Sequence, residues 1–256
     1  HEGYKAGREK NRFRVNRQYQ GMMDEEQERL SMKQQFVWLN DILDYLPVQT
    51  MIYDGIEADD TIAYLTKHNE SDLGNEVVIV STDKDFLQLV SDKVKVFSPT
   101  KKKMYNRQVV FDEFGIWPEN LLLYRTLDGD KSDNIPGIRG CGIKTLLKRF
   151  PELSEDRTIT HEDLFQMCEE KQGKIKLYDD ILKAKDQLLM NKRLMELDEP
   201  HIPTNQKLNI LDRFNESDIE FKKLDFLRVG QKYKVLQNWR DINDWLHSTF
   251  HNIITK

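Results

Sequence analysis

The stretch EVVIVSTDKD, residues 76–85, decides the fold class of this chain. Its continuous apolar run, Glu76–Ser81, predicts a strand buried on both faces, as in a parallel sheet covered by helices. Asp83 and Asp85 follow this strand directly, so we expect them at the carboxyl end of the sheet, where α/β proteins bind ligands. The stretch therefore predicts an α/β fold with a polar site at that edge.

The segments around this strand alternate between strand-like and helix-like patterns. The predicted helices are Met23–Tyr45, Glu57–His68 and Asp85–Val90, and the further predicted strands are Gln49–Tyr53, Lys93–Ser98 and Met104–Phe111. From Pro118 onward the pattern is helical, at Glu119–Leu127, Ile143–Phe150, His161–Glu170 and Lys174–Asn191, with apolar stretches at Phe221–Leu227 and Tyr233–Phe250. We expect a mostly parallel central sheet with flanking helices in residues 1–130, and a helical domain with a C-terminal tail in residues 131–256.

The composition excludes several classes of protein. The chain has 256 residues, 38% hydrophobic and 32% charged, which is an ordinary globular composition and not a collagenous or disordered one. No apolar run reaches the roughly 18 residues that a membrane helix needs. Cys141 and Cys168 are too few for a disulfide framework and lack the spacing of a zinc site, so we expect a reducing, cytoplasmic compartment.

The charge distribution says more than the net charge of −5. Residues 1–20 form a basic arm, with six Lys and Arg against two Glu. Two further basic clusters lie close in sequence to acidic ones. These are Lys101, Lys102, Lys103 and Arg107, then Lys131, Arg139, Lys144, Lys148 and Arg149, against Asp54–Asp60, Asp83–Asp85 and Asp128–Asp133. Such a pattern suits a phosphodiester enzyme, although any one charge run is also compatible with a solvated face.

The three acidic clusters predict a metal site. Each has a structural alternative: carboxylates in the first turn of a helix, a helix cap after the strand, and ordinary turn chemistry. Three unrelated caps explain the set less well than one site for Mg²⁺ or Mn²⁺, which are hard ions that take oxygen ligands. We expect two ions, which together activate water and stabilise a leaving oxygen. The candidate ligands are Glu57, Asp59, Asp60, Asp83, Asp85, Asp130 and Asp133.

The stretch IPGIRGCGIKT, residues 135–145, predicts a phosphate-binding turn. Its three glycines permit close backbone approach, and the N–H groups that open the next helix form an anion site. Lys144 and Lys148 add positive charge on that helix. The spacing is that of a helix-hairpin-helix motif for sequence-independent duplex binding, and the alternative is an ordinary helix end and turn.

The ordered motifs EADD at 57–60, STDKDFLQL at 81–89 and GDKSDNIPGI at 129–138 resemble the 5′ nuclease family. That family includes the 5′ nuclease domain of bacterial DNA polymerase I, phage flap endonucleases and phage ribonuclease H. The resemblance covers residues 4–150 well. It implies a PIN-like 5′ nuclease core with a helical arch and a C-terminal helical domain that contains the helix-hairpin-helix motif.

The resemblance also implies roles for particular residues. The seven carboxylates match the family's metal ligands, and Lys5 and Arg8 match the base of the arch, where they reach the scissile phosphate. Tyr4 matches the aromatic residue that stacks on a base. Gly137, Gly140 and Gly142, with Lys144 and Lys148, match the DNA-binding hairpin, whose carbonyls hold K⁺.

The family's chain opens with two strands that each end in a metal-ligating Asp, whereas this sequence begins at His1. We therefore expect that a segment lies upstream. The resemblance implies a metal-dependent 5′-3′ exonuclease and flap endonuclease that removes 5′ flaps or RNA primers in replication and repair. The implied substrates are branched, nicked or flapped duplexes and RNA–DNA hybrids, and the implied state is a monomer. The alternatives are a non-catalytic branched-DNA-binding module of the same fold, or another metal-dependent nuclease with a similar core.

Overall fold

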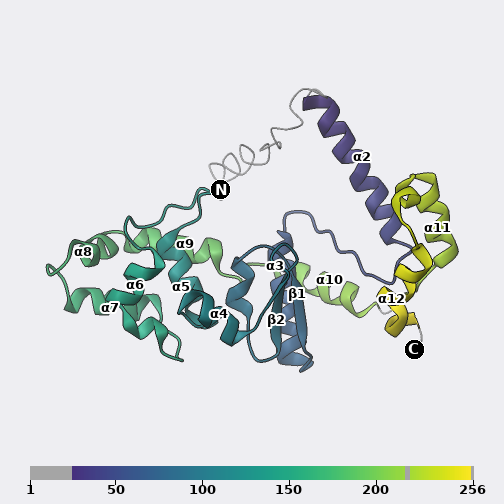
Figure 1. Cartoon of the computed structure of the whole chain (residues 1–256). Helices are drawn as coiled ribbons and strands as arrows, with labels where there is room; N and C mark the ends of the chain where they lie inside the picture. The colour runs from purple at the N-terminus through teal and green to yellow at the C-terminus, as the bar shows by residue number, and fades with distance from the viewer. Residues whose placement is uncertain (1–24, 217–219, 255–256) are drawn as a thin grey trace. The chain divides into compact units, whose positions relative to one another are not determined.

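The computed structural model describes residues 25–216 and 220–254 (Figure 1). These residues form two compact units, one spanning 55–203 and the other combining 25–54 with the described residues after 203. Residues on both sides of the predicted division at 130/131 lie in the first unit. The division at 130/131 therefore does not coincide with a boundary between the two compact units. It stays a prediction of where the α/β part of the sequence ends and the helical part begins.

The first unit contains a small mixed sheet. Its strands are β1 (Val77–Val80), β2 (Val94–Ser98) and β3 (Lys103–Tyr105), in that spatial order. β1 and β2 are parallel, with Val77 opposite Val94, whereas β2 and β3 are antiparallel, with Val96 opposite Tyr105. A mostly parallel sheet was predicted, but the described pairings are one of each kind, because the short turn after Ser98 returns the chain as a hairpin.

Strand β1 is covered on one face only within the described part of the chain. Ile79 is 5% exposed, whereas Val78 and Val80 are 51% and 66% exposed. The prediction that both faces are buried is therefore wrong for these residues. A run of β-branched residues has the propensity for a strand whichever of its faces is covered, so the pattern could not decide this point.

Two other predicted strands are corrected. Residues 49–53 form no strand, and the Gln49 side chain donates to the carbonyls of Arg213 and Glu216 in a loop. The predicted strand Met104–Phe111 ends at Tyr105, because the Asn106 side chain accepts the Val109 N–H at 2.9 Å and starts a helix. Asparagine is a strong helix N-cap, and this signal outweighs the apolar pair that follows it.

Helices make up most of the first unit. They are α3 (Ala58–Lys67), α4 (Arg107–Phe114), α5 (Pro118–Asp128), α6 (Ile143–Arg149), α7 (His161–Glu170), α8 (Lys176–Lys183) and α9 (Lys185–Met195), with short turns η2 (His68–Asp72), η3 (Asp85–Leu89) and η4 (Pro151–Ser154). The predicted helix Lys174–Asn191 is two helices that meet at Ala184. Helix α7 has the predicted bounds, because Thr160 and Asp163 form a capping box at its start.

Helix α5 is the centre of this unit. It contacts η3, α4, α6 and α9, and Leu127, Asn120 and Thr126 are completely buried on it. Asn120 donates to the Arg157 carbonyl at 2.9 Å and accepts the Ile159 N–H at 2.7 Å. These bonds satisfy a buried amide that would otherwise destabilise the core. They also fix the segment that follows η4 against α5.

The second unit is helical. It contains α2 (Glu25–Leu43), α10 (Thr204–Asn215), α11 (Lys223–Lys232), the turn η5 (Val235–Asn238) and α12 (Ile242–Ile254). Phe226, Leu246 and Phe250 form its buried centre. Trp38 of α2 stacks on Tyr233, with the two ring centroids 5.2 Å apart. Helix α10 was not predicted. Among the described helices, none is long and apolar enough to cross a membrane.

Buried His161 makes stability depend on pH. Thr126 Oγ1 donates to the Leu123 carbonyl at 2.8 Å, so it accepts from His161 Nε2 at 3.0 Å, and the ring is neutral. Burial lowers the pKa of His161 to about 4. The unfolded state therefore binds a proton below pH ~6.5 that the folded state does not.

We expect the His161 contribution to the free energy of unfolding to fall by about 2 kcal/mol between pH 7 and pH 5. Urea unfolding of the wild type and of His161→Phe measures it, because the variant lacks this titration. Parallel pH profiles for the two proteins would contradict the assignment.

Candidate metal and nucleic-acid site

The turn after β1 places Asp83 and Asp85 where the sequence predicted them. The Ser81 hydroxyl accepts the Asp83 N–H at 3.0 Å, and Asp83 Oδ1 accepts the Asp85 N–H at 2.9 Å. These two bonds fold the chain from the end of β1 directly into η3. Asp83 remains exposed, whereas the Asp85 side chain is 21% exposed. The helix cap considered as an alternative is not formed by these side chains, because Lys84 occupies the N-cap position of η3 without a side-chain cap bond, and the bonds of Ser81 and Asp83 instead close local turns.

Arg125 of α5 joins the second and third acidic clusters. Its Nε donates to Asp85 Oδ1 at 2.8 Å, and its Nη2 donates to Asp130 Oδ2 at 2.6 Å. All three side chains are about four-fifths buried. One guanidinium therefore bridges two carboxylates that the sequence separates widely.

The two bridged carboxylates titrate differently. Burial raises the pKa of Asp85, and Asp83 and Asp130 add to this effect, while Arg125 opposes it. Burial also acts on Asp130, but hydrogen bonds from Ser132 and Arg125 outweigh it and lower the pKa. Desolvation dominates at Asp85 and hydrogen bonding at Asp130, so the pair carries an uneven proton affinity.

The loop after α5 is built around Asp130. Asp130 Oδ1 accepts the Ser132 N–H at 2.7 Å and also accepts from the Ser132 hydroxyl. The Asp130 N–H donates to the Ile135 carbonyl at 2.9 Å, and the reverse bond measures 2.7 Å. Turn chemistry, the alternative for this cluster, is therefore present, and it holds Asp133 close behind Asp130 in a short closed loop.

The first acidic cluster lies at the start of α3. Glu57 is the residue that caps this helix, and Asp59 and Asp60 occupy its first turn. Burial raises the pKa of Asp60, Glu57 raises it further, and His201 opposes both. This cluster was predicted to follow a strand. It does not, because residues 49–53 form no strand. Helix α3 does contact η3, which carries Asp85.

The described carboxylates have the donor atoms that a hard cation prefers, but they do not lie close enough together to form a complete metal site. Their donors are all oxygens, the type that Mg²⁺ and Mn²⁺ prefer. Within residues 25–216 and 220–254, however, no three His, Cys, Asp or Glu side chains lie close enough to hold a metal ion. The structure brings Asp83, Asp85 and Asp130 into one electrostatic group and Glu57 and Asp60 into another.

The glycine-rich loop packs its backbone against the end of α5. A Cβ on Gly137 would lie 2.0 Å from the Asp128 carbonyl oxygen, so only glycine fits there. Gly140 has φ +89°, and Gly142 caps α6 with open space around it. Lys144 and Lys148 are exposed on α6. Tyr4, Lys5 and Arg8 lie outside the described residues.

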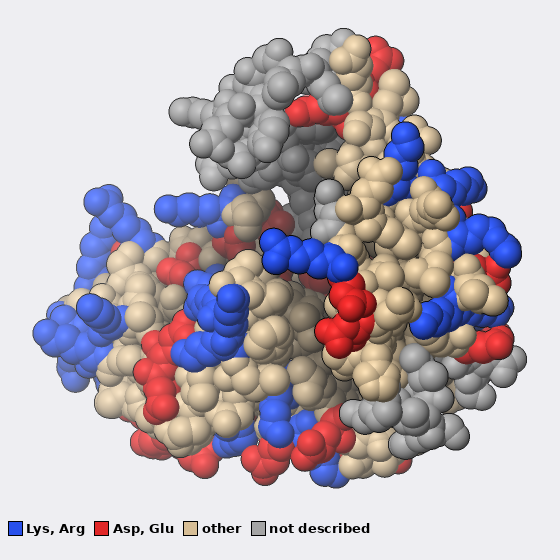
Figure 2. Space-filling view, turned by 45° about the vertical axis from the view of Figure 1, so that its right-hand side comes forward, with Lys and Arg blue, Asp and Glu red and all other residues tan. Residues whose placement is uncertain are grey.

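On the face shown in Figure 2, the basic side chains of the described residues do not form one continuous surface. In the space-filling view, Lys and Arg form several separate groups with Asp and Glu between them (Figure 2). Part of the basic charge is already paired. Lys101 and Lys103 both bind Glu113, at 2.9 and 2.8 Å, and these hydrogen bonds lower the pKa of Glu113 to about 2 against the opposing effect of burial.

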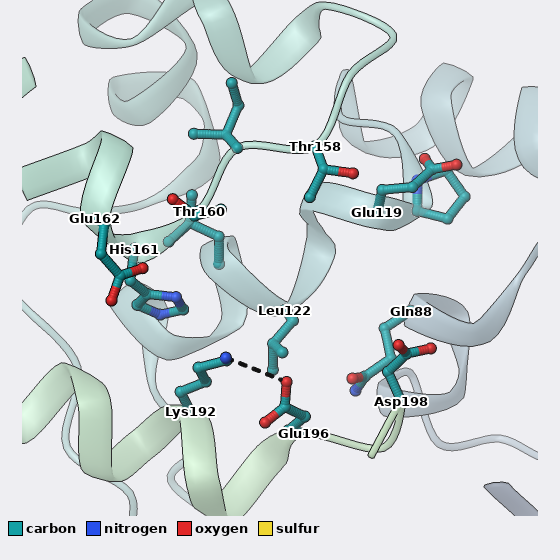
Figure 3. Close-up of a pocket in the computed structure, with 13 residues that line it drawn as sticks. Gln88, Glu119, Leu122, Thr158, Thr160, His161, Glu162, Lys192, Glu196 and Asp198 are labelled. Carbon is teal, nitrogen blue, oxygen red and sulfur yellow. Dashed lines mark ion pairs between the residues drawn. The ribbon is translucent and has the colours of Figure 1, made fainter.

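A cavity behind η3 was not predicted from the sequence. Its volume is about 310 Å³, and its lining includes Gln88, His161, Lys192 and Glu196, none of which is a predicted site residue (Figure 3). Gln88 donates to the carbonyls of Asp85 and Met195 at 3.0 Å, and its Oε1 accepts the Leu197 N–H at 3.0 Å. One wall of this cavity therefore fixes the backbone of Asp85.

Arg125 is the other residue that sequence reasoning missed. It lies in the last turn of α5, where a basic residue is ordinary because it complements the helix dipole. The only hint in the sequence that Arg125 pairs with a carboxylate is its spacing of five residues from Asp130. Its other partner, Asp85, is forty residues away in the sequence. The long-range partner was invisible in the sequence.

The small sheet, the helices packed around it and the acidic turn after β1 define an α/β domain. Residues 1–115 match the family model described as "5′-3′ exonuclease, N-terminal resolvase-like domain". The chain is 32% identical to a 5′-3′ exonuclease of Aquifex aeolicus, over 80% of this chain and 64% of that protein. It is 34% identical to DNA polymerase I of Bacillus subtilis, over 75% of this chain and 21% of that protein.

Solved structures share the fold. T5 5′-exonuclease with bound zinc matches with a TM-score of 0.59 at 24% identity, over 88% of this chain and 76% of that one. T5 D15 protein co-crystallised with metal ions matches with a TM-score of 0.57 at 23% identity, over 87% and 79%. The predicted resemblance to the 5′ nuclease family is confirmed. The chain spans 64% and 21% of the two curated relatives named above.

The glycine loop gives a prediction with an internal control. Gly137→Ala should lower the free energy of unfolding by more than about 2 kcal/mol, because the new methyl group meets backbone atoms that cannot move aside. Gly142→Ala, in the same loop, should change it by less than about 1 kcal/mol, because nothing lies within 4 Å of the new Cβ. Urea unfolding of both variants measures the difference, and equal losses would show that the loop backbone is not packed as described.

Proposed function

We propose that this protein is a metal-dependent, structure-specific 5′ nuclease. It acts as a 5′-3′ exonuclease and flap endonuclease, and it removes 5′ flaps or RNA primers in DNA replication and repair. The observation that carries the proposal is the placement of Asp83 and Asp85 at the end of β1, with Asp130 held beside Asp85 by Arg125. The similarity to the family model and to the two curated relatives named above supports it.

The proposed metal ligands are Glu57, Asp59, Asp60, Asp83, Asp85, Asp130 and Asp133, which would hold two Mg²⁺ or Mn²⁺ ions. Bound ions of this kind supply a nucleophile from water and stabilise the leaving oxygen. Backbone N–H groups would orient two of these ligands. The Asp85 N–H donates to Asp83 Oδ1, and the Ser132 N–H donates to Asp130 Oδ1. A relative of the same fold, T5 D15 flap endonuclease, has been solved as a pseudo-enzyme–product complex with DNA and metal ions.

The glycine loop is proposed to be the duplex-binding hairpin of a C-terminal helical domain. Gly140 and Gly142 leave the backbone open, which permits close approach of a phosphate. Lys144 and Lys148 face solvent on α6 and would contact the DNA backbone without reading its sequence. A K⁺ ion held by the loop carbonyls is part of this proposal, as are Tyr4, Lys5 and Arg8 at the base of the arch.

The proposed partners are branched, nicked or 5′-flap duplexes and RNA–DNA hybrids, bound by a monomer in the cytoplasm. The curated relatives named above are a 5′-3′ exonuclease and a DNA polymerase I, which supports a role in DNA metabolism. Because phosphate contacts dominate such binding, affinity should fall as salt rises.

Replacing Asp83 by Asn is the sharpest test of the activity. The amide oxygen can still accept the Asp85 N–H, so the turn is preserved while one ligand charge is lost. We expect cleavage of a labelled 5′-flap duplex in Mg²⁺ to fall at least about 100-fold, with binding of the same duplex in Ca²⁺ unchanged.

Asp92→Asn is the matched control, since Asp92 is exposed in the same unit and belongs to no proposed site. It should cleave at the wild-type rate. Undiminished cleavage by Asp83→Asn would sink the ligand assignment. Absence of product from the wild type at any Mg²⁺ concentration would favour a branched-DNA-binding module.

A further inference from the structure

Arg125 is held between two acidic clusters in a way that no surface ion pair would be. Its side chain is 18% exposed, and it uses two different nitrogens, Nε and Nη2, for two different carboxylates. Asp85 belongs to η3, and Asp130 belongs to the loop after α5. The guanidinium is a planar fork, so its position fixes both the separation and the orientation of the two carboxylates.

We propose that Arg125 is a positioning residue for the metal site, an inference that rests on the proposed function. It keeps Asp85 and Asp130 side by side with one oxygen of each turned toward the guanidinium. Without a cation between them, two buried carboxylates this close together would repel and separate. Arg125 therefore sets the spacing of two ligands before an ion binds, and continues to orient them afterwards.

The surroundings make this bridge rigid on both sides. Asp130 Oδ1 is held by the backbone and side chain of Ser132, so Arg125 is tied to a closed loop and not to a mobile side chain. On the other side, Gln88 holds the Asp85 carbonyl at 3.0 Å. Helix α5 itself packs against η3. The position of Asp85 is thus set by Arg125 on the side chain and by Gln88 on the backbone.

A lysine cannot replace this geometry. Its ammonium is one point charge at the end of a flexible stem, whereas the two bonds of Arg125 leave from nitrogens that point in different directions. Arg125→Lys keeps the charge and loses the fork. Arg125→Gln keeps a hydrogen-bond donor and loses the charge. The two variants separate the electrostatic part of the role from the geometric part.

The test is Mn²⁺ binding by the intact protein, measured by calorimetry in the absence of DNA. Removing a group that orients metal ligands typically weakens metal binding by about 10- to 100-fold. We expect a loss in that range for Arg125→Gln and a smaller loss for Arg125→Lys. Arg157→Gln, which breaks an exposed pair with Glu155 in the same unit, should bind Mn²⁺ as the wild type does.

Thermal unfolding in EDTA and at one fixed, subsaturating Mn²⁺ concentration separates positioning from a purely structural role. A positioning role predicts that Mn²⁺ at a fixed subsaturating concentration raises the Tm of the variants less than that of the wild type. A lower Tm with unchanged Mn²⁺ affinity would overturn the proposal. If Arg125→Gln shows no cooperative unfolding, the same comparison is made with Arg125→Lys, whose charge is retained.

The outcomes distinguish this inference from the proposed activity. A wild type that binds Mn²⁺ but cleaves no flap would remove the activity and leave the role of Arg125 intact. A wild type that cleaves, with variants that bind Mn²⁺ normally, would overturn the role of Arg125 and leave the activity intact. A wild type that binds no Mn²⁺ would overturn both.

Discussion

The burial of helix α5 is the constraint on which the first unit depends. Its neighbours are η3, α4, α6 and α9, and its residues Asn120, Thr126 and Leu127 are completely buried. Asn191 of α9 illustrates the consequence, because its side chain donates to the carbonyls of Thr126 and Pro136 at 2.9 and 2.8 Å. One buried amide thus ties α9 to both the end of α5 and the glycine loop. A buried donor left without these partners would destabilise the unit, so the three segments keep one arrangement.

That arrangement brings the site together. The chain leaves α5 at Asp128, folds back at Gly129 and passes Gly137 so tightly that no side chain fits at either glycine. The loop so formed presents Asp130 on the side of Arg125, and Arg125 reaches across to Asp85. Hydrogen bonds and close backbone packing therefore connect the turn after β1, the end of α5 and the glycine loop. The Arg125 guanidinium pairs with both carboxylates, and its removal would leave two largely buried charges uncompensated.

The sequence predicted the elements whose signals are local. Helix α7, helix α5 and the strand at Val77–Val80 follow from residues within a few positions of each element. The errors occurred where a local signal competed with a tertiary one. Residues 49–53 are apolar enough for a strand, but no described strand pairs with them, and Asn106 starts a helix where the strand was predicted to continue. The exposure of Val80 depends on what covers β1, a property that no run of valines contains.

The sequence predicted the carboxylates of the candidate site but not Arg125, the residue that bridges two of them. Aspartates after a strand and in a glycine-bounded loop are visible in one dimension, whereas the bridge from Arg125 to Asp85 spans forty residues and needs the fold. The turn bonds of Asp83 and Asp130 are compatible with the ligand role proposed for both residues. Asp83 uses Oδ1 to accept a backbone N–H and carries Oδ2 besides. Asp130 uses Oδ1 to shape a turn, and its Oδ2 accepts from Arg125. Such turn bonds are how a loop holds a carboxylate still, and a metal ligand must be held still to bind strongly. Turn chemistry and ligand chemistry are therefore two uses of the same side chain.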